Sequence, residues 1–206
     1  MTALLLAVTA VIAYFFGQLP GAVIISRYLF HSDCRRRGGR CNPGYGEFQS
    51  RYGVRGIAVL MAFDAAKGLL ACLIGGALLS TQDLAAIGRI FGAFCCILGH
   101  NYPMLQRFMG GKGTFLAGIM AFAVDWRVAL CCWGAWVIIM VFTRYLSLAC
   151  CAAAVLGAIF MWIFQYSGLE GAVALICALA IVLRWRKNLS AMLTGTEPRL
   201  NLTRGA

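Results

Sequence analysis

A glycine-rich segment with one histidine and one lysine carries the chemically most informative residues of the chain. It holds His100 and Lys112 around three glycines, Gly110, Gly111 and Gly113. Backbone without a Cβ can approach a ligand closely, and a lysine at the start of the next apolar segment adds charge where a helix N-terminus already favours anions. His100 changes charge near neutral pH. The segment predicts a phosphate site; the alternative is a membrane turn with a snorkelling lysine and a capping histidine.

An ATP-binding loop is excluded by the spacing of the same segment. That motif requires Gly-x-x-x-x-Gly-Lys-Ser/Thr after a strand. Here Gln106 stands at the position of the first glycine, and Gly113 follows the lysine. We therefore expect phosphate binding without a nucleotide.

The composition is that of an integral membrane protein. Of the 206 residues, 62% are hydrophobic and 12% are charged, and the mean hydropathy is +0.82. A transmembrane helix needs roughly 20 apolar residues, and fewer where it is broken or re-entrant. The expected fold is an all-α membrane domain over residues 1–206, with about seven transmembrane helices.

Seven apolar segments can be placed along the chain. They cover residues 3–26, 54–79, 84–98, 114–124, 128–142, 146–166 and 171–183. The first should be bent by Pro20 and its neighbouring glycines. Segment 114–124 spans about 17 Å as a helix and cannot cross roughly 30 Å of hydrocarbon. The glycine-rich loop before it is therefore expected partly within the membrane depth, buried in protein.

The positions of the basic residues predict the orientation. Most of the 18 Lys and Arg residues fall in alternate connections, which are expected on the cytoplasmic side. This places the N-terminus outside and the C-terminus in the cytoplasm, with cytoplasmic loops 27–55 and 100–113 and a cytoplasmic tail 184–206. The net charge of +11 then reflects topology, and no nucleic-acid partner is expected.

Further polar residues lie inside or beside the apolar segments. Asp64 and Lys67 share a helix face, and charges in a span indicate either function or mutual pairing. The arginines of segment 33–44 can bind phosphate through paired hydrogen bonds. Most of the ten cysteines lie inside the spans without metal-ligand spacing, so we expect them to act as small packing residues and no metal to be bound.

Four motifs together resemble a known family. They are Gly99-His100-x-x-Pro103 with Gly110-Gly111-Lys112-Gly113, Asp64-x-x-Lys67-Gly68, Asp33-x-Arg35-x-x-Gly38, and Arg186-x-Asn188 with Leu193-Thr194-Gly195-x-Glu197. In order and spacing the chain is similar to the bacterial acyl-phosphate:glycerol-3-phosphate acyltransferases of the PlsY type. The resemblance covers nearly the whole chain.

The resemblance implies a seven-span enzyme of the bacterial inner membrane with its site facing the cytoplasm. It would transfer an acyl group from acyl phosphate to the 1-hydroxyl of glycerol 3-phosphate, giving lysophosphatidic acid for phospholipid synthesis. No cofactor is implied. The substrates and membrane lipid are the implied partners.

By motif position the resemblance also implies roles for residues. Lys112 and the backbone of Gly110, Gly111 and Gly113 would bind phosphate, and His100 would bind a phosphate or assist removal of the hydroxyl proton. The residues implied to position glycerol 3-phosphate are Arg35, Asn42, Arg51 and Lys67. Asn188 and Glu197 would close the site from the tail.

The first loop departs from the family pattern. The Ser, the Thr and the second Asn of that pattern are absent, Glu47 stands at the last of these positions, and Arg51 comes one residue after the usual arginine. Glu47 near an anionic substrate is unfavourable unless an arginine such as Arg51 neutralises it. A paralogue using another phosphorylated acceptor therefore stays open. So does a non-catalytic protein or transporter in which Asp64, Lys67 and Arg89 line a path.

Overall fold

The chain folds into a bundle of α-helices, seen here in a computed structural model that describes residues 1–35, 42–164, 166 and 168–200. Arg36, Arg37, Gly38 and Arg40 of the arginine-rich segment lie outside the described residues. The helices are α1 (Thr2–Gly17), α2 (Gly21–Tyr28), α3 (Tyr45–Ser80), α4 (Ala85–Asn101), the short 3-10 turn η1 (Met104–Gln106), α5 (Thr114–Val124), α6 (Trp126–Thr143), α7 (Leu146–Ile163) and α8 (Gly168–Leu193).

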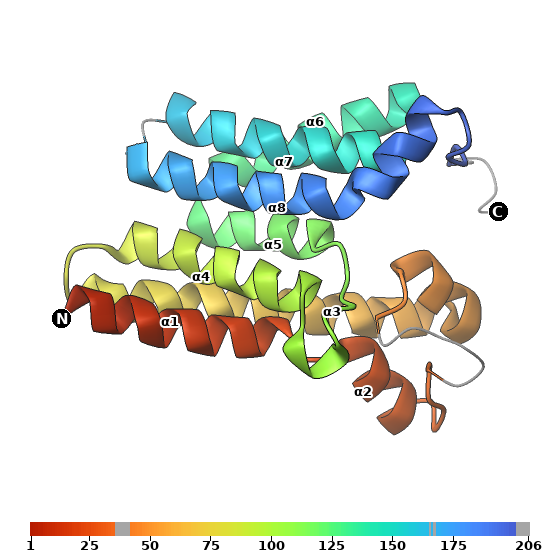
Figure 1. The fold of residues 1–206 in the computed structure, drawn as a ribbon, viewed down its shortest axis with the longest axis horizontal. Helices are drawn as coiled ribbons and strands as arrows, with labels where there is room; N and C mark the ends of the chain where they lie inside the picture. The colour runs from red at the N-terminus through yellow and green to blue at the C-terminus, as the bar shows by residue number, and fades with distance from the viewer. Residues whose placement is uncertain (36–41, 165, 167, 201–206) are drawn as a thin grey trace.

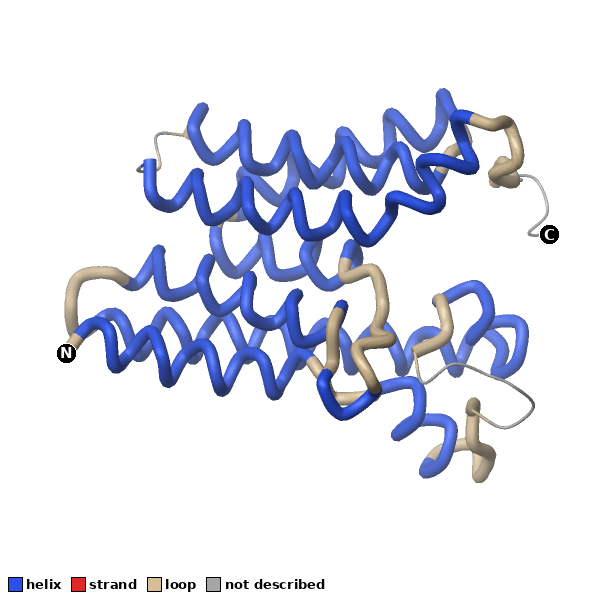
Figure 2. The backbone as a smooth tube through the Cα atoms, viewed as in Figure 1, coloured by secondary structure: helices blue, strands red, loops and turns tan. Residues whose placement is uncertain are grey.

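The helices form two groups joined by α5. Figure 1 shows α6, α7 and α8 side by side above α1, α3 and α4, and α5 lies between the groups, in contact with α3, α4 and α6. Helix α4 also contacts α8, which brings the helix before the glycine-rich loop against the last helix. The described residues form helices and loops and no strand, as Figure 2 shows.

The all-α membrane fold expected from the composition is confirmed. Four helices, α3, α6, α7 and α8, are long and apolar enough to cross a membrane. Helices α1 and α2 pass the same test as a pair bent by 45°, in agreement with the bend expected around Pro20. Helix α5 has the predicted bounds and is only 11 residues long. The count of seven spans and the orientation of the termini stay predictions.

Two helices extend beyond the predicted apolar segments. Helix α3 begins at Tyr45, inside the predicted loop 27–55, and is broken at Gly53, whose φ of 67° is a left-handed conformation that suits glycine. Helix α8 continues to Leu193 and so includes residues 184–193 of the predicted tail 184–206. Both extensions lie at the end of the bundle that also carries loop 102–113, which we call the basic end (Figure 1).

The core is packed with small side chains, including the cysteines. Cys72, Cys95, Cys96, Cys150 and Cys151 belong to one buried cluster that joins α3, α4 and α7. All are free thiols. The prediction that the cysteines act as small packing residues is confirmed for these five.

Candidate active site at the basic end of the bundle

A buried ion pair on α3 forms the base of the site. Lys67 Nζ lies 2.6 Å from Asp64 Oδ1, and both side chains are almost fully buried. The second carboxylate oxygen accepts a hydrogen bond of 2.7 Å from the Tyr45 hydroxyl, at the start of the same helix. Lys67 also reaches the carbonyl oxygen of Leu19, in the bend between α1 and α2, at 3.4 Å. The predicted pairing is therefore present, and it ties α3 to the bend between α1 and α2.

His100, near the end of α4, links this ion pair to the glycine-rich loop. Its Nδ1 lies 3.2 Å from Lys67 Nζ. A Cβ built on Gly111 would fall 2.2 Å from His100 Nε2 and 2.9 Å from Asn42 Nδ2. The backbone of Gly111 thus lies close to both the histidine ring and the asparagine amide, and this approach requires a glycine.

The carbonyl groups of the glycine-rich loop are held by an arginine from α8. Arg184 donates from Nε to the Gly111 oxygen at 2.9 Å and from its terminal nitrogen to the Gly110 oxygen. Its guanidinium lies 5.1 Å from the ring centroid of Tyr102. The Gly111 amide donates to the His100 carbonyl at 3.0 Å. The loop is therefore fixed from α4 and from α8.

Lys112 lies in a polar cluster contributed by the last helix and the segment after it. Its Nζ donates to Asn188 Oδ1 at 2.9 Å and lies over the ring of Trp185. Asn188 in turn donates to Glu197, whose other carboxylate oxygen accepts from the Ser147 hydroxyl. Burial lowers the pKa of Lys112 below its ordinary value, and the charge of Glu197 partly opposes this shift.

The start of α5 is suited to an anion. Gly113 precedes the helix with a φ of 72°, and no side chain caps the first turn among the described residues. The fully buried Asn101 lies against Gly113, since a Cβ there would meet Asn101 Oδ1 at 2.7 Å. Neither amide atom of Asn101 has a hydrogen-bond partner in the described part of the chain. Free N–H groups at a helix start and an unpaired amide are groups that phosphate oxygens can satisfy.

Two of the predicted site residues are engaged within the first loop instead. Arg35 pairs with Asp33 at 2.8 Å, and these contacts, with those of Arg27, hold the pKa of Asp33 below its ordinary value. Arg51 pairs with Glu47 at 2.7 Å and donates to the Cys34 carbonyl. The expected neutralisation of Glu47 by Arg51 is therefore present.

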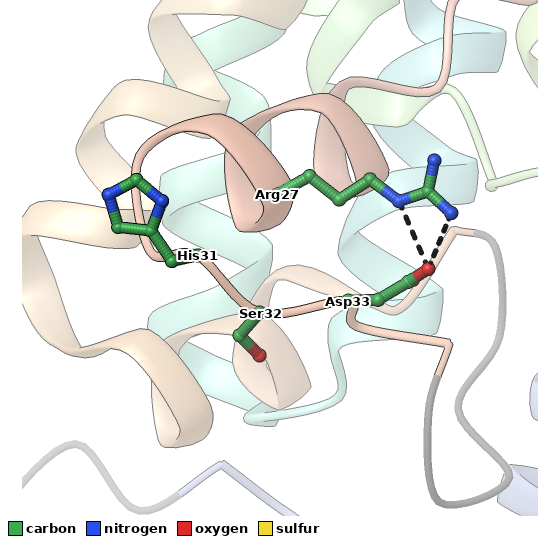
Figure 3. Close-up of a pocket in the computed structure, with 4 residues that line it drawn as sticks. All are labelled: Arg27, His31, Ser32 and Asp33. Atoms are coloured by element: carbon green, nitrogen blue, oxygen red, sulfur yellow. Dashed lines mark hydrogen bonds and ion pairs between the residues drawn. The ribbon is translucent and has the colours of Figure 1, made fainter.

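A shallow surface pocket lies beside this loop. It is lined by Arg27, His31, Ser32 and Asp33 at the end of α2 (Figure 3). Figure 3 shows Arg27 reaching across to the Asp33 carboxylate. The pocket contains none of the predicted site residues, so its chemistry is that of an exposed ion pair.

Arg89 lies at the other end of α5 and has a structural partner there. It donates to the Ala123 carbonyl at 3.2 Å, and its side-chain stem lies against Gly76. A cation at the C-terminal end of a helix stabilises the unpaired carbonyl groups there. Asp64, Lys67 and Arg89 thus all have partners within the protein. Their presence in apolar helices is explained without a transport path.

Sequence reasoning missed several polar groups of the site. Arg184 was grouped with the basic tail, and Asn101, Tyr45 and Ser147 were given no role. The one sequence signal for these residues was a polar side chain at the edge of an apolar segment. This signal does not predict which residue, distant in the sequence, the side chain contacts.

Fold and site together define a helical membrane protein with a glycine loop, a lysine and a histidine gathered at one end of the bundle. Comparison with known proteins agrees. The sequence profile of the family described as glycerol-3-phosphate acyltransferase matches residues 7–195. The chain belongs to the glycerol-3-phosphate acyltransferase family and is by family an acyltransferase.

Individual relatives cover almost the full length. A glycerol-3-phosphate acyltransferase of Methylococcus capsulatus is 34% identical over 195 residues, which are 93% of this chain and 94% of the relative. One of Ralstonia nicotianae is 33% identical, covering 94% and 93%. The crystal structure of PlsY (YgiH), an integral membrane glycerol 3-phosphate acyltransferase, in the glycerol 3-phosphate form, superposes with a TM-score of 0.80 at 27% identity, covering 95% of this chain and 96% of that one.

Proposed function

We propose that the protein transfers an acyl group from acyl phosphate to the 1-hydroxyl of glycerol 3-phosphate, releasing inorganic phosphate and forming lysophosphatidic acid. The observation that carries the proposal is the convergence of Lys112, the glycine backbone at 110–113 and His100 at the start of α5. Both substrates carry phosphate, and a lysine with free helical N–H groups is suited to hold it.

The reaction needs positioning more than covalent catalysis. Acyl phosphate is an activated mixed anhydride, so attack by the hydroxyl forms the ester bond and breaks the bond between the acyl carbon and the phosphate oxygen. The hydroxyl proton leaves with the expelled phosphate as hydrogen phosphate. The two anions repel each other, and a fixed positive charge lowers the free energy of bringing them together. The charge of Lys112, held by Asn188 and Trp185, supplies this effect.

Roles for the remaining residues are part of the proposal. Gly110, Gly111 and Gly113 present backbone to phosphate, and Asn42, at the glycine loop, contacts glycerol 3-phosphate. Lys67 serves the site through its contact with His100. Asn188 and Glu197 close the site and orient Lys112. Arg35 and Arg51 attract the acceptor from the exposed first loop, where each also carries a carboxylate partner.

The location of the site is also proposed. The basic residues at the basic end favour the cytoplasmic side of the bacterial inner membrane, where glycerol 3-phosphate is dissolved and the alkyl chain of the donor arrives through the lipid. Seven spans, with the N-terminus outside, are compatible with the bent pair α1 and α2 and the short α5.

The altered first loop favours one second candidate, another phosphorylated alcohol as acceptor. Glu47 forms its ion pair with Arg51 on the exposed surface, so part of the positive charge available to an acceptor is already neutralised. In this second candidate function the protein still transfers an acyl group from acyl phosphate, and only the acceptor alcohol differs.

The test is phosphate release by the purified protein in lipid, given palmitoyl phosphate with and without glycerol 3-phosphate, with lysophosphatidic acid identified by mass spectrometry. We expect release that depends on the acceptor. Lys112→Ala should reduce it by roughly 100-fold or more, as for loss of a charge-stabilising donor. Lys187→Ala is the matched control, because Lys187 is an exposed lysine on α8.

Each failure has a distinct meaning. Equal activity of Lys112→Ala and Lys187→Ala would overturn the assigned phosphate site. A folded protein without release on glycerol 3-phosphate, but active on another phosphorylated alcohol, would select the second candidate. Inactivity on every acceptor and donor would reject both.

A further inference from the structure

All three N–H donors of the Lys67 ammonium are used within the protein. Its acceptors are Asp64 Oδ1 at 2.6 Å, His100 Nδ1 at 3.2 Å and the Leu19 oxygen at 3.4 Å. An ammonium has three donors and no acceptor. The side chain is also almost fully buried. Lys67 therefore has no proton left for a substrate and can act only through the groups it contacts.

The contact with His100 determines where the imidazole carries its proton. Because the Lys67 ammonium can only donate, Nδ1 of His100 must accept and cannot be protonated. The proton of the neutral ring is then on Nε2. That nitrogen faces the backbone of Gly111 in the glycine loop. His100 thus presents an N–H donor, and no free lone pair, to the proposed phosphate site.

We propose that Lys67 is a positioning residue that fixes His100 in the tautomer protonated at Nε2. His100 then donates a hydrogen bond to a phosphate oxygen of the substrate and does not take the proton of the attacking hydroxyl. The inference rests on the proposed function for the identity of the substrate. The tautomer itself depends only on the contacts among Lys67, His100 and their neighbours.

Asp64 and Tyr45 hold Lys67 in the required position. The Asp64 carboxylate pairs with the Lys67 ammonium at a buried place, where an unpaired charge is costly. Tyr45 donates to the second carboxylate oxygen, and its ring packs edge-on against Phe115 at the start of α5, with centroids 5.4 Å apart. Without the hydroxyl, that buried oxygen would compete for Lys67 and draw Nζ away from His100.

The chain allows a direct measurement, because it contains only two histidines, His31 and His100. His31 is exposed, so His31→Gln leaves His100 as the single imidazole. In this variant, labelled with ¹⁵N-histidine and reconstituted in lipid without substrate, NMR distinguishes protonated from unprotonated ring nitrogens. We expect a protonated Nε2 and an unprotonated Nδ1. A ring protonated at Nδ1 instead would overturn the proposal.

Two substitutions in the His31→Gln background test the cause. Lys67→Met removes the donor and should give a mixture of tautomers. Tyr45→Phe keeps the ring and the ion pair and should increase the minor tautomer while the protein stays folded. It should lower kcat by roughly tenfold, less than the roughly 100-fold that a misplacement of about 1 Å can cost, and leave the KM for glycerol 3-phosphate within about twofold. Lys67→Arg, which restores a donor, should recover part of the Nε2-protonated form.

Tyr52→Phe is the matched control for Tyr45→Phe. Tyr52 lies on the same first segment of α3, and its hydroxyl contacts Ser32, away from the Asp64–Lys67 ion pair. It should change neither the tautomer nor kcat. An unchanged tautomer in both Lys67→Met and Tyr45→Phe would show that Lys67 does not set it. If Lys67→Met does not fold, the proposal is still tested by the tautomer measured in the His31→Gln protein and by the change of tautomer in Tyr45→Phe.

The failures of the two proposals can be told apart. An Nε2-protonated His100 in a protein without acyl transfer would reject the proposed function and leave the tautomer assignment intact. An active acyltransferase with His100 protonated at Nδ1 would reject only the role of Lys67.

Discussion

The ammonium of Lys112 lies 3.5 Å from the centroid of the Trp185 ring. The two residues come from the glycine-rich loop and from α8, far apart in the chain. A cation against an aromatic face gains about 0.5 to 2 kcal/mol, more when it is removed from water. Here the contact directs a half-buried positive charge to the start of α5, beside the glycine backbone.

The first prediction concerns the pH dependence of acyl transfer. Burial lowers the pKa of Lys112, so the lysine loses its charge, and with it the phosphate affinity, at a lower pH than an exposed lysine. We expect kcat/KM to fall on the alkaline side before pH 10.5, the ordinary lysine value. The measurement is the acyl-transfer rate between pH 7 and pH 10.5, corrected for spontaneous hydrolysis. Lys112→Arg, which stays charged, should lose this alkaline decline even if it is slower. The same decline in Lys112→Arg would assign it to another group.

The second prediction concerns the support of the glycine loop by Arg184. Arg184→Gln removes the donors to the Gly110 and Gly111 carbonyls, so the loop should lose its fixed position. We expect kcat/KM to fall by roughly 10- to 100-fold, because a displacement of about 1 Å can cost 100-fold. Arg186→Gln, at an exposed position on the same helix, is the control for the loss of one basic charge. Equal effects of the two substitutions would indicate a general charge effect.

The third prediction tests the close approach of Gly111. A methyl group in Gly111→Ala would overlap His100 Nε2 and press on Asn42. The ring or the loop must move, so we expect a loss of activity of roughly 100-fold with a folded protein. Gly134→Ala, on α6 with open space around its Cβ, should leave activity unchanged and can stabilise the helix by up to about 1 kcal/mol. Full activity of Gly111→Ala would show that the close approach is not required.

The fourth prediction concerns stability at the opposite end of the bundle. Asp125 is the N-cap residue of α6: it accepts from the Arg127 amide, pairs with the Arg127 guanidinium at 2.7 Å and accepts from the Tyr166 hydroxyl. These contacts lower the pKa of Asp125 to about 2. The stabilisation is therefore present above the unfolded value of 3.8 and is lost as the pH falls through about 2.

Thermal unfolding in detergent checks this prediction. Asp125→Ala should cost about 1 kcal/mol from the lost cap alone. Asp125→Asn keeps a capping oxygen but cannot titrate, so its stability should change less than that of the original protein between pH 4 and pH 2. Parallel losses of stability in both proteins over that range would assign the acid sensitivity to other carboxylates.

The membrane-buried parts of the fold could be predicted well from the sequence because hydropathy and length constrain them directly. The bounds of α5 and the bend near Pro20 follow from apolar runs and helix breakers. The end of α8 could not be found in this way. Its apolar run stops at Leu183, but the helix continues to Leu193 because Arg184 and Asn188 find partners on the interior side of the helix.

The site was predictable to the extent that its residues belong to motifs. The contacts of His100 with Lys67 and of Lys112 with Asn188 join segments that the resemblance had already brought together. The hydrogen bonds from Arg184 to the glycine-rich loop could not be predicted, because their acceptors are backbone carbonyl groups, which carry no sequence signal. The partner of Tyr45 likewise depends on the break at Gly53 and on how the first segment of α3 folds back.

The last helix has a consequence for biosynthesis. Arg184 and Asn188 lie one turn apart on α8 and hold, respectively, the loop carbonyls and the Lys112 ammonium. The ribosome synthesises α8 after α4 and the glycine-rich loop, so a nascent chain contains the loop and His100 before it contains the two side chains that support the loop. A nascent chain that does not yet contain α8 should therefore be inactive as an acyltransferase, and activity should appear only after α8 has packed against the loop.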